Sequence, residues 1–99
     1  MQRITRTKSF VFEGKIGDEI ASKLSLWGRV FVKGELLIFS IDSGEIKARS
    51  MKADAKSSVR RIYIEPACGC RMEIDEIRDF ENDTISYNLV EVKYCPQHK

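Results

Sequence analysis

The chain has 99 residues, enough for one small domain or for one domain with an appendage. Hydrophobic residues make up 42% of it and charged residues 32%, which excludes a disordered or collagen-like chain. The longest apolar run, residues 36–39, is far shorter than the roughly 18 residues that a membrane-spanning helix needs, and no secretory signal pattern follows the basic amino terminus. We therefore expect a cytoplasmic protein.

Charge and cysteine are distributed unevenly along the chain. Residues 1–66 hold 13 Lys and Arg against 8 Asp and Glu, whereas residues 67–99 hold 4 against 7, so the two parts carry net charges of +5 and −3. All three cysteines and the single histidine fall in the second part. This asymmetry predicts two units, and only the first offers an attractive field to a nucleic acid.

The first part begins with a clear alternation of secondary-structure signals. Aromatic and β-branched residues at 8–13 predict a strand, and Gly17-Asp18 predicts the start of a helix of about two turns. Two strand-like runs, at 29–32 and 35–41, flank Lys33-Gly34, whose glycine tolerates the positive φ of a tight turn. These runs predict a hairpin.

A long helix is predicted next, from about Asp42 to Glu65. Asp42 stands three residues before Glu45, as in a capping box, and Pro66 prevents continuation of a helix. One stripe with 3.6-residue spacing is apolar, and its members are Ala48, Met51, Ala55, Val59 and Ile62. A second stripe is cationic and consists of Arg49, Lys52, Lys56 and Arg60.

Each stripe allows two interpretations. The apolar stripe of Ala48, Met51, Ala55 and Val59 suits close packing against a partner helix, but packing on the chain's own sheet is the more common reason for such a stripe. The cationic residues Arg49, Lys52, Lys56 and Arg60 suit contact with nucleic-acid phosphates, but a solvated helix face is the more common role of such a charge run.

The last third predicts a second hairpin, with strands at about 71–80 and 85–94 around a turn at 81–83. The alternation shifts phase near Leu89, which predicts a β-bulge. A hairpin brings its two ends together, so it places Cys68 and Cys70 beside Cys95 and His98. Three thiolates and one imidazole form a tetrahedral ligand set for structural zinc, with iron as the alternative metal. The spacing of Cys68 and Cys70 is unusual, because a single residue separates them.

The segment Ser50–Ile62 resembles the final-helix pattern of a known family, the small dimer-forming subunit of the KEOPS (EKC) complex. That pattern is Leu-Arg-Ala, then Asn-Ser, then an aliphatic residue and Arg. The equivalent places here are filled by Met51, Lys52, Ala53, Ser57, Val59 and Arg60. The strand from Leu36 to Asp42 is also similar, and the resemblance covers about two thirds of the chain.

The resemblance implies a homodimer that docks an ATP-dependent transferase subunit through its helices, in a complex that makes the threonylcarbamoyl modification of adenosine in tRNA. It implies no catalytic activity of this chain, a contact with tRNA, and an archaeal origin. An unpaired sheet edge in so small a unit independently suggests pairing with a second copy.

We therefore expect an α+β protein that is not an enzyme: a βαββα antiparallel sheet with helices on one face (1–66), followed by a zinc-closed β-hairpin (67–99). Its expected function is that of an accessory subunit in tRNA modification. The alternative is a stand-alone zinc-containing protein that binds nucleic acid or has a regulatory role. A cysteine-dependent enzyme built on Cys95 and His98 is disfavoured, because no orienting partner is indicated.

Overall fold

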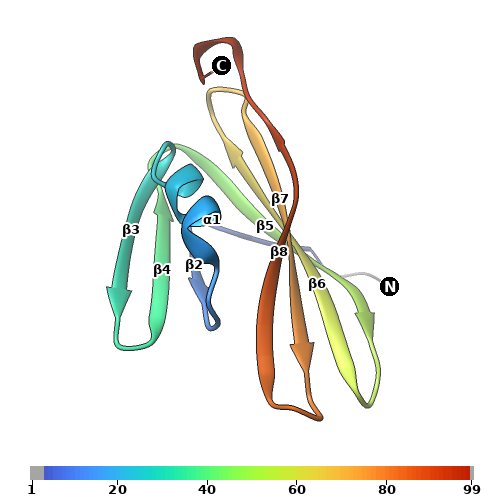
Figure 1. Cartoon of the computed structure of the whole chain (residues 1–99). Helices are drawn as coiled ribbons and strands as arrows, with labels where there is room; N and C mark the ends of the chain where they lie inside the picture. Colours follow the sequence, from blue (N-terminus) through green and yellow to red (C-terminus); the bar gives the residue numbers. More distant parts are fainter. Residues whose placement is uncertain (1–3, 99) are drawn as a thin grey trace.

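The computed structural model in Figure 1 describes residues 4–98, which form two antiparallel sheets and one α-helix. A five-stranded sheet has the order β1-β5-β6-β7-β8, and a three-stranded sheet has the order β2-β4-β3. The elements are β1 Ile4–Thr7, β2 Ser9–Phe12, α1 Gly17–Leu24, β3 Gly28–Lys33, β4 Leu36–Ile41, β5 Gly44–Ala53, β6 Ser57–Pro66, β7 Arg71–Asp79, β8 Thr84–Lys93 and the short 3-10 helix η1 Pro96–His98. None of the helices in this range is long and apolar enough to cross a membrane.

The elements expected up to residue 41 are confirmed. They appear as β2, α1, β3 and β4, and Gly34 in the β3–β4 turn has a φ of 64°. The two sheets share the amino-terminal segment: β1 pairs with β5, whereas β2, after a single intervening residue, pairs with β4. The amino-terminal strand segment thus joins the two sheets.

The long helix expected after Asp42 is wrong, and with it the βαββα pattern. Residues 44–66 form β5 and β6, which pair with each other along most of their length. The fully buried side chains here are Ile46, Ile62 and Ile64, which alternate with half-buried neighbours in the period-two manner of a strand. The helical stripe included only one of these three residues, and the β-branched run at 62–64 favours a strand.

The turn between β5 and β6 shows why the chain reverses there. The Asp54 carboxylate accepts hydrogen bonds from the backbone N–H groups of Lys56 and Ser57, at 2.8 and 2.9 Å, and the Asp54 N–H donates to the Ser57 carbonyl. These amide donors lower the pKa of Asp54. A side chain that caps its own turn competes with helix formation, so Asp54 ends one strand and starts the next.

The carboxy-terminal hairpin is confirmed as β7 and β8, and its register shifts between Glu73 and Ile74, opposite the segment that contains Val90. This irregularity lies next to the position where the change of alternation predicted a bulge. β7 also pairs with β6, so the five-stranded sheet extends across the boundary that we place after Pro66. The division into residues 1–66 and 67–99 stays a prediction.

The core lies between the two sheets and under α1. The three-stranded sheet contributes Phe10, Phe12 and Phe39, and α1 adds Ile20 and Leu24. The five-stranded sheet completes the same cluster with Ile46, Ala48, Ile62, Ile64, Met72, Ile74 and Tyr87. The opposite face of the five-stranded sheet, which we call the outer face, carries the polar side chains that alternate with these residues.

One charged group is enclosed in this core. Glu76 is only 1% exposed, and its Oε1 lies 2.9 Å from Nη2 of Arg60, whose guanidinium stacks on the Phe10 ring. The Tyr87 hydroxyl donates to Glu76 Oε2 at 2.6 Å and accepts from the Glu13 N–H at 3.2 Å. Burial, followed by the hydrogen bond to Glu76, raises the pKa of Tyr87, so the hydroxyl remains a donor. This network joins β2 to β6, β7 and β8.

We predict that Tyr87→Phe lowers the free energy of unfolding by about 2 kcal/mol, because a buried carboxylate loses a donor and a charge-assisted hydrogen bond is worth more than a neutral one. Urea denaturation followed by circular dichroism measures the change. Tyr94→Phe, at a tyrosine that is 38% exposed, is the matched control and should change stability by less than about 0.5 kcal/mol. Equal effects of the two substitutions would contradict the structural role of the network.

Candidate metal centre

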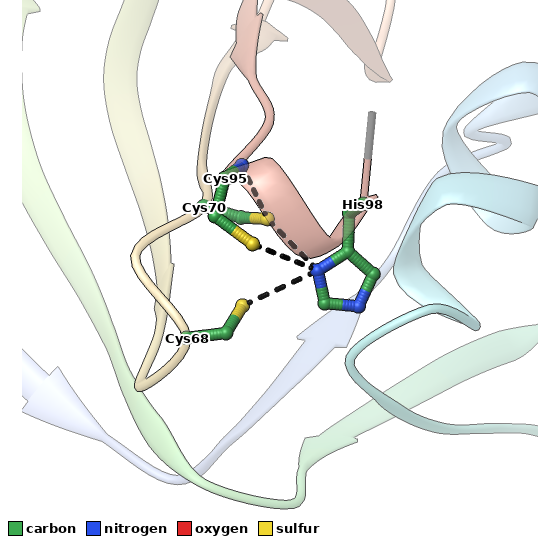
Figure 2. A group of neighbouring side chains, drawn as sticks. All are labelled: Cys68, Cys70, Cys95 and His98. Atoms are coloured by element: carbon green, nitrogen blue, oxygen red, sulfur yellow. Dashed lines mark hydrogen bonds between the residues drawn. The ribbon is translucent and has the colours of Figure 1, made fainter.

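The four candidate ligands come from the two ends of the β7–β8 hairpin. Cys68 and Cys70 lie in the segment that joins β6 to β7, whereas Cys95 follows β8 and His98 ends η1. The hairpin places these ends side by side, because Arg71 at the start of β7 is opposite Lys93 at the end of β8. Figure 2 shows the three thiols pointing at one nitrogen of the imidazole.

The distances suit a tetrahedral metal ion. His98 Nδ1 lies 3.6, 3.4 and 3.0 Å from the Sγ atoms of Cys68, Cys70 and Cys95, and all four ligand atoms lie within 4.8 Å of one another. Zinc bonds of about 2.3 Å to sulfur and about 2.1 Å to nitrogen imply ligand separations of about 3.6 Å at the tetrahedral angle. The cluster could therefore hold a metal ion.

Local backbone geometry explains how a one-residue spacing can work. Gly69 has a φ of 103°, a conformation that other residues rarely adopt, and its N–H donates to the Pro66 carbonyl at 3.2 Å. This turn brings Cys68 and Cys70 to the same side. Gly69 therefore allows two cysteines separated by a single residue to contribute to the same site.

The second pair of ligands is set by a short helical turn. Pro96 begins η1, where its fixed φ is favourable, and the His98 N–H donates to the Cys95 carbonyl at 3.0 Å. The Cys95 N–H in turn donates to the Cys70 sulfur at 3.1 Å, which ties the two ligand-bearing segments together. Cys70 and Cys95 are buried and Cys68 is exposed, so the ligands form a site that opens to solvent on one side.

The surroundings of the centre include residues that sequence reasoning missed. A cavity of about 200 Å³ beside Cys68 and His98 is lined by Leu26, Trp27, Asp42, Ser43 and Pro66. The Trp27 ring lies 6.5 Å from that of Tyr94, next to Cys95. Trp27 could not be assigned to the site from the sequence, because it lies 41 residues before Cys68 and only the tertiary fold brings the two residues together.

The expected nucleic-acid residues do not form one stripe. Arg49 lies on the outer face of the five-stranded sheet, opposite Arg61, and Lys52 forms an ion pair with Asp54 near the end of β5. Lys56 lies in the β5–β6 turn, and Arg60 pairs with the buried Glu76 on the inner face. The helix that would have aligned these four side chains is replaced by two strands.

The expected partner-binding residues are separated in the same way. Ala48 is buried in the core, and Met51 lies at the register shift of β5, 42% exposed. Ala55 lies in the β5–β6 turn, and Val59 lies on β6 opposite Ile77. They share no surface of the kind that the helical spacing predicted.

A basic pocket on the outer face was not predicted. It has a volume of about 180 Å³ and is lined by Lys47, Arg49, Tyr63, Glu65 and Arg71, three cations against one carboxylate. Glu65 lies 2.8 Å from Lys47 Nζ, and the hydrogen bond to this carboxylate raises the pKa of Lys47. Arg71 stacks over Tyr63 with 5.0 Å between guanidinium carbon and ring centroid. These residues come from three strands, so their proximity depends on the strand register.

The comparisons with known proteins add no assignment. No protein-family model matches the chain, and searches of curated proteins and of solved structures find no match.

We predict that Gly69→Ala weakens metal binding, because it forces a φ of 103° on a residue with a Cβ, at a cost of about 1–2 kcal/mol. Competition with a chromogenic chelator measures the change in affinity, which should be about tenfold. Gly17→Ala is the matched control, since Gly17 also has positive φ (78°) with no atom within 4 Å of an added Cβ. Unchanged metal affinity in the Gly69 variant would contradict the role assigned to this turn.

Proposed function

We propose that the protein is not an enzyme, that it holds a structural zinc ion, and that its function is to bind another molecule. The observation that carries this proposal is the cluster of Cys68, Cys70, Cys95 and His98, with all four ligand atoms within 4.8 Å of one another. Four protein ligands complete a tetrahedral shell. They leave no position for a water or a substrate, which a catalytic zinc site requires.

Zinc suits this ligand set better than iron does. Three thiolates with one imidazole are a common structural zinc shell, whereas mononuclear and cluster iron sites in proteins generally use four cysteines or a different set of ligands. Such a metal would connect the β6–β7 segment to the segment after β8. In a chain of 99 residues this connection would contribute directly to folding, because the site does not exist in the unfolded state.

The accessory role in tRNA modification stays a prediction, as does the homodimer. The residues of closest resemblance, 50–62, form the distal part of the β5–β6 hairpin instead of a helix. A docking surface for the transferase subunit made of helices is therefore not supported by this fold, and the proposal for this chain is based on its metal centre and its sheet surfaces.

We predict about one zinc per chain in purified protein, measured by atomic emission, and a lower melting temperature after treatment with a chelator. Cys70→Ser should lose the metal and a large part of the stability. Gln97→Ala, at an exposed residue beside His98, is the matched control and should retain both. Metal-free protein that melts like the untreated protein would contradict a structural role.

The second candidate function is binding of nucleic acid, and the basic pocket on the outer face favours it. Lys47, Arg49 and Arg71 surround an open sheet surface on which Tyr63 provides an aromatic ring. Cations that neutralise phosphates and aromatic rings that stack on bases are the usual components of single-strand binding surfaces. This pocket differs from the set first expected, with Arg49 as the residue in common.

We predict that Arg71→Gln weakens binding of a fluorescein-labelled single-stranded oligonucleotide several-fold, measured by anisotropy. The slope of log affinity against log salt should fall by about one, because one phosphate contact is lost. Lys23→Gln on α1 is the control cation and should leave affinity and slope unchanged. Equal effects of both substitutions would indicate general charge attraction and would exclude a site in this pocket.

A further inference from the structure

Strand β3 is an unpaired sheet edge. In the described part of the chain, residues 4–98, it lies at the end of the order β2-β4-β3 and pairs only with β4. Figure 1 shows this strand at the margin of the molecule, with the β3–β4 turn at the end away from the C-terminus. An edge of this kind presents backbone donors and acceptors to which another strand can be added.

The side chains of β3 give this edge a specific character. Arg29, Phe31 and Lys33 alternate along the strand and therefore point to the same side, and all three are exposed, Phe31 by 50%. Phe31 continues an apolar row across the sheet, because it lies opposite Ile38, which lies opposite Val11. An exposed aromatic residue thus stands between two cations.

The other side of the same edge has a cavity. A pocket of about 340 Å³ lies between the start of α1 and the β3–β4 hairpin, and its apolar lining includes Ala21, Val32 and Leu37. Val32 is 70% exposed although it points toward the core side of the sheet. A strand added beside β3 would therefore have one side chain facing Phe31 and its neighbour facing this pocket.

A second copy of the chain does not suit this edge. If two β3 strands paired antiparallel about Phe31, Arg29 of each would lie opposite Lys33 of the other. Like charges directly opposite each other destabilise a strand pair. Carboxylates at the same two positions would instead be attracted, so in this register the charges on the edge disfavour self-pairing and favour an acidic partner.

We propose that β3 binds an extended acidic peptide segment by strand addition, with carboxylates opposite Arg29 and Lys33 and apolar side chains opposite Phe31 and Val32. The side chain opposite Val32 enters the pocket beside α1. This inference deepens the proposed role as a binding protein and rests on it. The expected partner is a protein segment that reads, from its amino end, acidic, apolar, apolar, any residue, acidic.

The test uses full-length zinc-loaded protein and the capped peptide Thr-Glu-Leu-Ile-Thr-Glu-Thr, whose antiparallel register places Glu opposite Lys33 and Arg29. We expect saturable binding by calorimetry. A peptide with Lys in place of both Glu residues should bind at least about tenfold more weakly. Isotope-edited NMR should show the largest shifts at the backbone amides of β3.

Variants of the protein test the contacts. The double substitution Arg29→Glu with Lys33→Glu should invert the preference, binding the Lys peptide more tightly than the Glu peptide, which a general loss of folding could not produce. Phe31→Ala should weaken binding several-fold. Phe80→Ala is the matched control, because Phe80 is 54% exposed but lies at the end of β7 away from this edge, and it should have no effect.

Three results would overturn the proposal: no saturable binding of the Glu peptide, equal binding of the Glu and Lys peptides, or amide shifts confined to other strands. Self-association through β3, detected by light scattering and lost in the Phe31 variant, would also overturn it. Zinc content and melting temperature of the same preparations separate the two claims. Failure of peptide binding with an intact metal centre would leave the proposed zinc site in place.

Discussion

The antiparallel pairing of β7 with β8 is the constraint on which the candidate metal centre depends. It sets Arg71 opposite Lys93, and so brings the segment with Cys68 and Cys70 against the segment with Cys95 and His98. Strand pairing alone supplies the proximity, while Gly69 and Pro96 supply the local turns that aim the ligands at one point. The bulge near Glu73 absorbs the extra residue of β8, so that Met72 and Tyr87 both face the core.

The same hairpin is held to the rest of the molecule by two different means. At the end near its turn, Glu76 and Tyr87 join β7 and β8 to Glu13 and Arg60 through one buried and two partly buried hydrogen bonds. At the opposite end the Cys/His cluster lies next to the cavity that Trp27 lines. The small two-sheet core is therefore stabilised by a hydrogen-bonded polar network near one end of the hairpin and by potential metal ligands near the other. The edge strands of the sheets remain available for contacts with other molecules.

The convergence of Cys68, Cys70, Cys95 and His98 into a cluster that could hold a metal ion was predictable from the sequence, because cysteine and histidine are rare here and because hairpin ends must meet. Sequence reasoning also identified β2, α1 and the β3–β4 hairpin, where turn glycines and apolar alternation agree. It failed at residues 44–66, where a helical spacing through Ala48, Met51 and Ala55 competed with the strand alternation of Ile46, Ile62 and Ile64, and burial favoured the alternation. The basic pocket could not be predicted, because Lys47, Tyr63 and Arg71 become neighbours only through the register of three strands.

The spacing of the four ligands has a consequence for the order in which the chain folds. Cys70 and Cys95 enclose 24 residues, the whole β7–β8 hairpin, so an ion that bound both cysteines before the strands paired would close a long loop. Pairing would then propagate from the open end of the hairpin toward its tip, the reverse of nucleation at a tight turn. Availability of the ion would thus determine the folding route of this hairpin as well as its final stability.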